Sequence, residues 1–432
     1  MKNFLKKYGV LSFYILTAVY CFILFSLQLP KYQSMLGGFL FVFVVDYYVW
    51  LKLRQLILSI KKKWLKWGIV FFYFLPLVLL FIFLGVLSVA HLSLWSPVAR
   101  TYLLGIPVIF FIPKLLMACF YLLSDIAPIT KIRLGTGFIK HIHYWAISVG
   151  LICLLILIHA SIFTVFNFKL KTETLKSSKI PPAFNDYRIV QFSDMHIGSF
   201  VKHGSIEKLC AEIMEAKPDL IVFTGDMVNF STKELLPYHT IFAKLKAKDG
   251  IYCVKGNHDY ASYVTWKKPQ DSLQSIHQMD CFYASLGWKC LNNEGVNIIH
   301  GRDTIALVGV ENWGKGERFP KLGNIDTAIK QIAPNLYTIL LSHDPSYFDS
   351  VIYKQYPQID LTLSGHTHGM QMGVRIGEKE YSPAQYLYPH FSGMYPQENG
   401  QKLYVSTGCG FNGFPFRVGV RPSVTLFILK TR

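Results

Sequence analysis

Five long apolar stretches in the first part of the chain restrict its fold more than any other feature of the sequence. They cover about residues 8–28, 34–53, 68–90, 101–124 and 143–166. Each can cross the hydrocarbon core of a bilayer as a helix, which takes roughly 20 residues. Lipid offers the backbone no hydrogen-bond partners, so such stretches are stable there only as helices. The sequence therefore predicts a transmembrane helical domain of about five helices over residues 1–168.

The distribution of basic residues supports this prediction and suggests an orientation. Residues 1–180 hold 19 of the 44 Lys and Arg residues but only three of the 26 acidic ones. Because these bases lie between apolar stretches and not on one accessible face, we expect no nucleic-acid partner. The fourth loop contains Lys131, Arg133 and Lys140, whereas the first and third loops contain only Lys31 and Arg100. The positive-inside rule then favours a cytoplasmic N-terminus and, with five spans, an extracytoplasmic C-terminal domain.

Two charged residues interrupt the apolar stretches. Asp46 lies in the second stretch and Lys114 in the fourth, and an unpaired charge is costly in lipid. We expect both side chains to face the interior of the helical domain and to pair with each other. The alternative is that they line a path for a substrate or an ion.

The pattern changes after residues 169–185, a polar segment with a proline pair that is predicted to be a linker. Its basic residues argue against the orientation given above. In residues 186–432, short apolar runs alternate with amphipathic segments, beginning with RIVQF, SIEKLCAEIMEAK, LIVFT, TKELLPYHTIFAKLKA and IYCVK. This alternation is typical of an α/β domain with buried, partly parallel strands. Residues 260–300 are less regular and could form an insertion or a cap.

Polar side chains of the kinds that bind metals follow five of the predicted strands. They are Asp194 and His196, Asp226, Asn257 with His258 and Asp259, His343, and His366 with His368. In open α/β sheets, ligands bind at the carboxyl ends of the strands, and glycines 225, 256 and 365 allow sharp turns there. One tetrahedral ion would not need so many ligands, whereas two ions that share a carboxylate would.

The blocks DMHIG, GDMVN, GNHDY, LSHDP and GHTHG, in this order, resemble the signature of the calcineurin-like metallophosphoesterase superfamily over roughly residues 186–430. The resemblance implies a four-layer αββα sandwich that holds two divalent ions, with Mn, Zn, Fe and Co all possible. It assigns Asp194, His196 and His368 to one ion, Asn257, His343 and His366 to the other, and Asp226 to both. It also implies that His258 contacts the phosphate and assists the leaving group, with Asp259 orienting its ring.

Such a centre implies a phosphoric ester hydrolase. Two cations lower the pKa of a bridging water, so that a hydroxide can attack phosphorus in line. His258 would then offset the negative charge that develops on the leaving group. A different interpretation is a metal-binding receptor or scaffold joined to a transporting or sensing helical domain. A receptor would have no need to keep His258.

The C-terminal part, for example KLYVSTGCGFNGFPFRVGVRP, resembles a membrane-associated bacterial branch of the superfamily. That branch includes multi-pass enzymes and some UDP-2,3-diacylglucosamine hydrolases. It implies a bacterial inner-membrane enzyme that acts on a lipid-linked or envelope phosphate or pyrophosphate. Thr407 replaces the arginine usual in YVSRG, so Arg417 and Arg421 are the candidate phosphate-binding residues. If the domain is cytoplasmic, UDP-2,3-diacylglucosamine is an alternative substrate, although soluble hydrolases of this compound have arginine at the position of His258. The aromatics of FNGFPF either pack in the core or receive an acyl chain.

Overall fold

The structure is a computed structural model that describes residues 2–28, 33, 36–90, 94–130, 136–201, 203–264, 266, 268–316, 319, 321–377 and 379–432. Backbone contacts divide the chain into two units, Met1–His159 and Ala160–Arg432. Of the basic residues on which the predicted orientation rests, Lys31, Lys131 and Arg133 lie outside the described residues.

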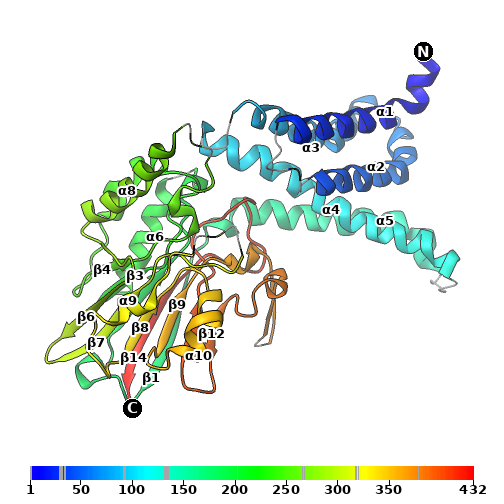
Figure 1. The fold of residues 1–432 in the computed structure, drawn as a ribbon. Coiled ribbons are helices and arrows are strands. Elements are labelled where there is room, and N and C mark those ends of the chain that lie inside the picture. Colours follow the sequence, from blue (N-terminus) through cyan, green and yellow to red (C-terminus); the bar gives the residue numbers. More distant parts are fainter. Residues whose placement is uncertain are drawn as a thin grey trace. The chain divides into compact units, whose positions relative to one another are not determined.

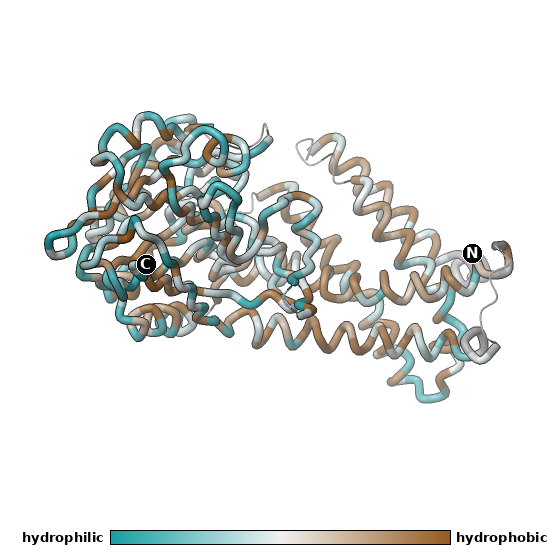
Figure 2. The backbone as a smooth tube through the Cα atoms, turned by 90° about the horizontal axis from the view of Figure 1, so that it is seen from below, coloured by the Kyte–Doolittle hydropathy of each residue, from teal (hydrophilic) through white to brown (hydrophobic). Residues whose placement is uncertain are grey.

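Long helices form the first unit, and the last of them extends into the second (Figure 1). They are α1 (Lys2–Ile23), α2 (Leu36–Leu58), α3 (Lys63–Leu87), α4 (Pro97–Thr130) and α5 (Thr136–Ile162). Figure 2 shows that apolar residues dominate along their lengths. Five stretches of the described residues are long and apolar enough to cross a membrane: Gly9–Leu27, Leu36–Leu58, Lys63–Leu87, Pro97–Ala127 and His141–Phe166. The prediction of five apolar N-terminal helices is confirmed.

The two charges inside these helices are paired, as predicted. The ammonium group of Lys114 donates to the carboxylate of Asp46 and, at 2.7 Å, to the backbone carbonyl of Tyr73. The hydroxyl of Tyr14 donates to the same carboxylate. Asp46 and Lys114 are both buried, and each side chain has hydrogen-bond partners inside the unit.

Two six-stranded sheets form the frame of the second unit. The first has the order β1 (Lys169–Ser177), β14 (Ser423–Thr431), β2 (Arg188–Phe192), β3 (Leu220–Phe223), β4 (Ile251–Cys253), β5 (Lys289–Cys290). The second has the order β12 (Gly393–Pro396), β13 (Lys402–Val405), β9 (Leu361–Ser364), β8 (Thr338–Leu341), β7 (Asp303–Gly309), β6 (Glu294–His300). β10 (Val374–Ile376) and β11 (Lys379–Tyr381) form a separate hairpin. Parallel pairing of β2 with β3, of β3 with β4, and of β8 with β9 brings the carboxyl ends of these strands to common edges.

Side-chain alternation along the strands builds four layers. Ile189 of β2 points into the core between the two sheets, where it joins Leu307 and Leu341. Its neighbours Val190 and Phe192 point to the opposite face and pack in a second core, as the two-residue period of a strand requires. That second core contains residues of α6 (His203–Glu215), α7 (His239–Phe242) and α8 (Pro269–Ser285).

A third core covers the outer face of the second sheet. It includes residues of α9 (Ile325–Ile329) and of a π-helical turn, Phe348–Ile352, and a residue of α10 (Tyr353–Gln355) packs against it. The layers are therefore helix, sheet, sheet and helix. The predicted four-layer αββα architecture is confirmed.

Three local predictions need correction. The supposed linker, residues 169–185, contains β1, which runs parallel to β14 at the edge of the first sheet. Only one of the nine residues of β1, Leu175, is buried. The strand therefore has no apolar run that would reveal it in the sequence. Residues 232–238, expected to be part of a helix, form a 3₁₀ segment that contains Pro237. The supposed insertion, residues 260–300, contains α8, β5 and β6, and the two strands extend the two sheets.

Candidate metal centre

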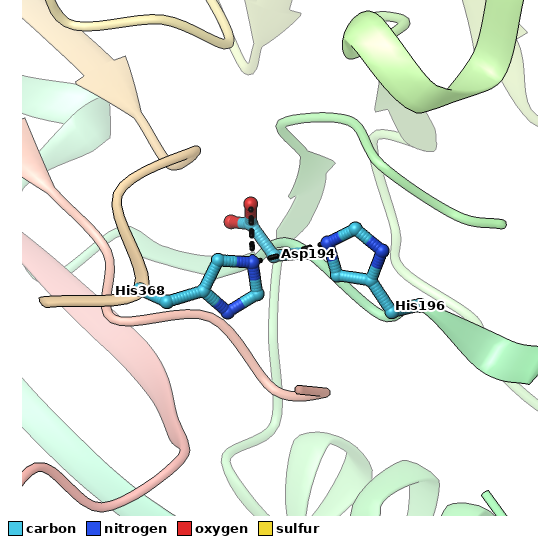
Figure 3. Close-up of side chains that lie close together, drawn as sticks. All are labelled: Asp194, His196 and His368. Carbon is cyan, nitrogen blue, oxygen red and sulfur yellow. Dashed lines mark hydrogen bonds and ion pairs between the residues drawn. The ribbon is translucent and has the colours of Figure 1, made fainter. Parts of the chain in front are cut away.

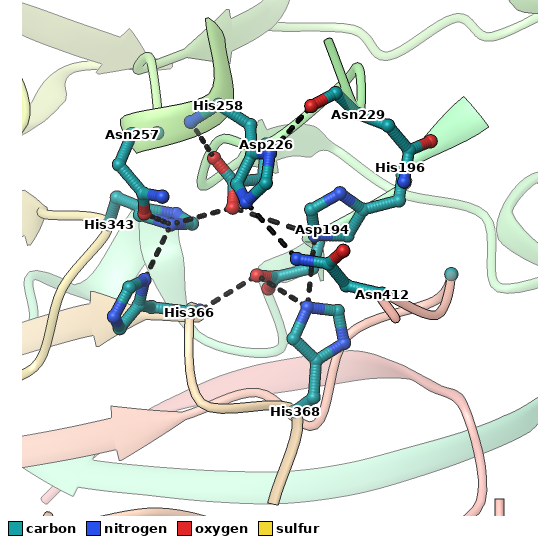
Figure 4. A network of polar contacts seen from close by, with 12 residues as sticks. Asp194, His196, Asp226, Asn229, Asn257, His258, His343, His366, His368 and Asn412 are labelled. Carbon is teal, nitrogen blue, oxygen red and sulfur yellow. Dashed lines mark hydrogen bonds and ion pairs between the residues drawn. The ribbon is translucent and has the colours of Figure 1, made fainter. Parts of the chain in front are cut away.

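The side chains predicted to bind metals come together at the carboxyl ends of five strands (Figure 4). Asp194 and His196 follow β2, Asp226 follows β3, Asn257 follows β4, His343 follows β8, and His366 and His368 follow β9. The first four of these residues follow strands of the first sheet, and the last three follow strands of the second. The site therefore depends on both sheets being packed face to face.

The backbone at this site is unusual. Five of the seven side chains stand on residues with left-handed φ angles: Asp194 (52°), His196 (42°), Asp226 (60°), His366 (72°) and His368 (52°). Residues other than glycine seldom adopt this conformation, and such residues cluster at functional sites. The surrounding packing holds the turns in place and aims the side chains inward.

Glycines allow this crowding in two different ways. Gly225 has a φ of +94°, which a glycine adopts without strain. Gly365 is needed for lack of space, because a Cβ there would lie 2.1 Å from Ser193 Oγ and 2.3 Å from Asp194 Oδ2. Neither Gly365 nor Gly256 has a left-handed φ, and the φ of Gly256 is −94°. Gly225 thus supplies a left-handed φ, whereas Gly256 and Gly365 are required by the close approach of neighbouring atoms, since a Cβ on Gly256 would lie 2.2 Å from Asp226 Oδ1.

One group of potential ligands contains Asp194, His196 and His368 (Figure 3). Their ligand atoms lie within 4.8 Å of one another. His196 Nε2 is 3.0 Å from His368 Nε2, which is 3.5 Å from Asp194 Oδ1. Two imidazole nitrogens that face each other at this distance are well placed to share a cation.

A second group surrounds His343 Nε2. This atom lies 3.2 Å from Asp226 Oδ2, from Asn257 Oδ1 and from His366 Nδ1. The other nitrogen of the ring, Nδ1, donates to the carbonyl of Thr224 at 2.7 Å. A hydrogen bond of this kind fixes the tautomer in which Nε2 offers its lone pair to a metal. Asp226 Oδ2 also lies 3.6 Å from His196 Nε2, so this carboxylate links the two groups.

The electrostatics of the site suit a cation. Burial, aided by His258, lowers the pKa of His196 to about 3, and burial also lowers the pKa of His368. Both rings are therefore neutral ligands at physiological pH. Burial opposes a charge on His343, yet Asp226 and Asp194 raise its pKa to about 10. The two carboxylates thus create a negative environment around His343 that would favour a bound cation.

Two side-chain atoms of the predicted ligands are among the buried polar atoms that have no hydrogen-bond partner in the described part of the chain. They are Asp194 Oδ2 and His196 Nδ1. A buried acceptor without a partner is costly, and a bound metal ion would satisfy Asp194 Oδ2. The donor set of carboxylate, amide and imidazole fits divalent ions of the Mn, Zn, Fe or Co kind.

His258 lies beside both groups, at the place expected of a residue that contacts substrate. Its backbone N–H donates to Asp226 Oδ1 at 2.8 Å, and its ring stacks on Tyr263. Nδ1 donates to the carbonyl of Asn229 at 2.7 Å, and the amide of Asn412 donates to Nε2 at 3.1 Å. Two hydrogen bonds therefore fix the ring, with Nε2 on the side of Asn412.

The expected role of Asp259 as the partner of His258 is wrong. Its carboxylate accepts hydrogen bonds from the backbone N–H groups of Asp226 and Gly256, both at 2.9 Å, and of Met227 at 2.8 Å. Asn229, through its carbonyl, holds His258 instead. Asp259 therefore fixes the turn that carries Asp226.

The two arginines proposed to bind phosphate have other partners. Arg417 is fully buried; its guanidinium donates to the carbonyl of Gly410 and lies 3.2 Å from His368 Nδ1. Arg421 donates to the side-chain oxygen of Asn167 at 2.6 Å. Arg417 thus backs a candidate ligand, and Arg421 is bonded to the residues that precede β1.

Three residues at the site escaped the sequence analysis. Asn229 and Asn412 hold His258, and the hydroxyl of Tyr388 lies 2.8 Å from His366 Nε2. Asn229 stands inside the GDMVN block and Asn412 inside FNGFPF, so both motifs carried a signal. Nothing in the sequence around Tyr388 marks it.

Known proteins are similar in sequence to a large part of this chain. A family model described as calcineurin-like phosphoesterase matches residues 187–370. The metallophosphoesterase YkuE of Bacillus subtilis is 31% identical over 269 residues, which cover 60% of this chain and 84% of that protein. The chain belongs to the calcineurin-like phosphoesterase family. It is therefore a metallophosphoesterase, an enzyme that hydrolyses phosphoric esters with divalent metals.

The names of two further relatives state a membrane location or a substrate. A transmembrane protein with metallophosphoesterase domain from Danio rerio is 28% identical over 259 residues, which cover 58% of this chain and 55% of that protein. The UDP-2,3-diacylglucosamine pyrophosphatase LpxG of Chlamydia muridarum is 28% identical over 218 residues, covering 43% of this chain and 65% of that protein. With the apolar helices, the first similarity indicates that this metallophosphoesterase is associated with a membrane.

Proposed function

We propose that this metallophosphoesterase is a membrane-anchored phosphohydrolase with two metal ions, and that it cleaves a phosphoester or pyrophosphate bond of a lipid-linked or envelope substrate. The observation that carries the proposal is the convergence of two ligand groups that share Asp226. Asp194, His196 and His368 would hold one ion, and Asn257, His343 and His366 the other. When bound, the ions would supply an activated water and neutralise phosphoryl charge.

The remaining chemistry belongs to the protein's own side chains. The hydrogen bond from His258 Nδ1 to Asn229 leaves Nε2 as the ring atom available to the substrate. In its protonated form, that nitrogen would donate to the leaving oxygen and lower the cost of bond cleavage. Asn412, which bonds Nε2 in the structure, would then turn to the phosphoryl group as a second donor.

A contact inside the second unit supports a substrate at the membrane surface. Phe166, the last residue of the fifth candidate span, lies 6.4 Å from Phe411 between ring centroids. Phe411 precedes Asn412, which bonds His258. In the same loop, the ring of Phe414 is exposed while Phe416 is buried. The span thus ends beside the loop that reaches the site, which suits a substrate whose acyl chains remain in lipid.

The proposal is tested with the full chain in lipid nanodiscs. With Mn²⁺ we expect release of nitrophenol from bis(p-nitrophenyl) phosphate and its loss in chelator. We also expect release of phosphate or of a headgroup from lipid-linked substrates presented in the same bilayer. Absence of hydrolysis with each of Mn, Zn, Fe and Co would favour the receptor interpretation.

A second candidate function follows from the similarity to LpxG, which is named for action on UDP-2,3-diacylglucosamine. That compound would require the catalytic domain to face the cytoplasm, whereas the loop charges favour an extracytoplasmic domain in a bacterial inner membrane. A C-terminal alkaline phosphatase fusion that is active outside the cytoplasm would exclude this substrate. An inactive phosphatase fusion with a fluorescent cytoplasmic reporter would instead support it.

A further inference from the structure

A polar cavity of about 780 Å³ lies in the second unit, apart from the residues assigned to the metals. Its walls are the first residues of β1, the β10–β11 hairpin and part of the segment 385–395. Four basic residues line it: Lys169, Lys171, Arg375 and Lys379. These charges have no part in the proposed hydrolysis.

The basic side chains are not neutralised by close ion pairs. Among the described residues, the four take part in no ion pair within 4.0 Å. Burial lowers the pKa of Lys171, and the nearby charges of Lys169 and Arg375 lower it further, although Glu380 and Glu173 act in the opposite direction. The bases are therefore close enough to repel one another, and an anion between them would relieve that repulsion.

Two acidic residues, Glu173 and Glu380, also line the cavity. Glu380 Oε2 accepts a hydrogen bond from Ser392 Oγ at 3.3 Å. Its Oε1 is buried and lies 3.9 Å from the point that a Cβ on Gly369 would occupy. One oxygen of Glu380 is thus buried, and the four bases outnumber the two acids that line the cavity.

The cavity begins where the chain leaves its fifth candidate span. Lys169 is three residues beyond Phe166, a separation of at most about 11 Å even in extended chain. The polar headgroup layer on each side of a bilayer is about 5–7 Å thick. If the span ends at the bilayer surface, the first of the four bases would lie within reach of lipid phosphates.

We propose that this cavity is a second binding site, distinct from the metal centre, for a phosphate-bearing ligand such as the headgroup of an anionic lipid. Lys171, Arg375 and Lys379 would contact the phosphate, because ammonium and guanidinium groups form strong hydrogen bonds with its oxygens. None of the residues assigned to the metals lines the cavity, although it borders their turn: Thr367, between His366 and His368, donates to the carbonyl of Phe391, which lines the cavity. The proposal does not rest on the proposed reaction.

The test measures binding by full-chain protein in a non-ionic detergent that contains EDTA, so that no turnover occurs. The probe is fluorescent dioctanoyl phosphatidylglycerol, read by anisotropy, with the phosphatidylcholine analogue as the zwitterionic reference. We expect Lys171→Gln/Arg375→Gln to weaken the Kd for phosphatidylglycerol about tenfold or more, since each removed cation costs a charged hydrogen bond. Lys379→Gln alone should weaken it by less.

The matched control is Lys289→Gln/Arg302→Gln, which removes one Lys and one Arg from exposed positions at the opposite edges of the sheets. Its Kd should equal that of the unchanged protein. Unchanged hydrolysis of bis(p-nitrophenyl) phosphate with Mn²⁺, or an unchanged melting temperature, shows that a variant is folded. If the unchanged protein does not hydrolyse the ester, the proposed reaction is contradicted, but the binding result stands.

Competition with inorganic phosphate identifies the source of the ligand. If phosphate displaces the probe only at concentrations far above the probe's Kd, the site reads a lipid headgroup. If phosphate competes with equal affinity, the site binds free phosphate, and the anion site stands. Equal binding of phosphatidylglycerol by the cavity variant and the control would overturn the proposal.

Discussion

At the scale of single residues, the site depends on positions where side chain and backbone are both constrained. Asp194 and Asp226 have left-handed φ angles, and the backbone N–H of His366 donates to Asp194 Oδ1 at 2.9 Å. Asp259 fixes the turn of Asp226 through its backbone. Each candidate carboxylate ligand is thus positioned before any metal binds, as precise ligand geometry requires.

The roles of His258 and Asp226 can be separated by substitution. His258→Ala should bind metal normally and lose about 100-fold to 10,000-fold in kcat, the range for a lost general acid. Asp226→Ala should lose both metal and turnover, because this carboxylate contacts members of both ligand groups. Metal content by mass spectrometry and hydrolysis of a nitrophenyl ester check both. Near-normal turnover by Asp226→Ala would refute the assignment of two metals.

Gly365 offers a test of the packing around Asp194. Gly365→Ala would place a methyl group 2.3 Å from Asp194 Oδ2, so we expect metal affinity to fall about tenfold or more, as for displaced ligand shells. Gly204→Ala is the control, because a Cβ there meets no atom within 4 Å. Equal metal affinity in a chelator titration of the two variants would show that Asp194 can move freely.

At the scale of helices and strands, the sequence predicted what has a strong local signal. Buried strands such as β2 and β3 appear as apolar runs, and polar residues at their ends marked the site. β1 was not predictable, because its polar residues are exposed at an edge and its partner β14 lies more than 240 residues later in the chain. The partners of His258 were missed for a similar reason. Asn412 reaches it from a segment 154 residues away, and no spacing rule joins such residues.

Leu175 should be the main apolar anchor of β1. It is 2% exposed, whereas Leu170 in the same strand is 39% exposed. Leu175→Ala should lower the free energy of unfolding by about 2–4 kcal/mol, as expected for a buried leucine. Leu170→Ala should lower it by much less. Thermal unfolding of the two purified variants in one detergent checks this, and equal melting temperatures would contradict the packing of β1.

At the scale of the whole molecule, an α-helical unit is joined to a catalytic unit, and two buried charges of the first are paired within it. Asp46 and Lys114 bind each other and Tyr14 and Tyr73. We interpret this arrangement as structural. If so, the helical unit anchors the enzyme, and its buried charges have no part in hydrolysis.

Breaking this pair tests the interpretation. Lys114→Met should destabilise the protein by about 3 kcal/mol, because it leaves a buried carboxylate without its cation. Asp46→Asn/Lys114→Met should recover most of that loss. Both variants should hydrolyse a water-soluble nitrophenyl ester at the rate of the unchanged protein while folded. A large fall in kcat for the double variant, at unchanged melting temperature, would instead indicate a functional path through the helices.

The connection between the fifth candidate span and β1 has a kinetic consequence. Only Asn167 and Phe168 separate Phe166 from the first residue of the strand, and Arg421 holds Asn167 in place. A catalytic domain on so short a stem cannot search the surrounding solution. It would meet lipid substrates by lateral diffusion within a single plane. The number of substrate molecules per unit area of membrane, and not their concentration per unit volume, would then set its rate.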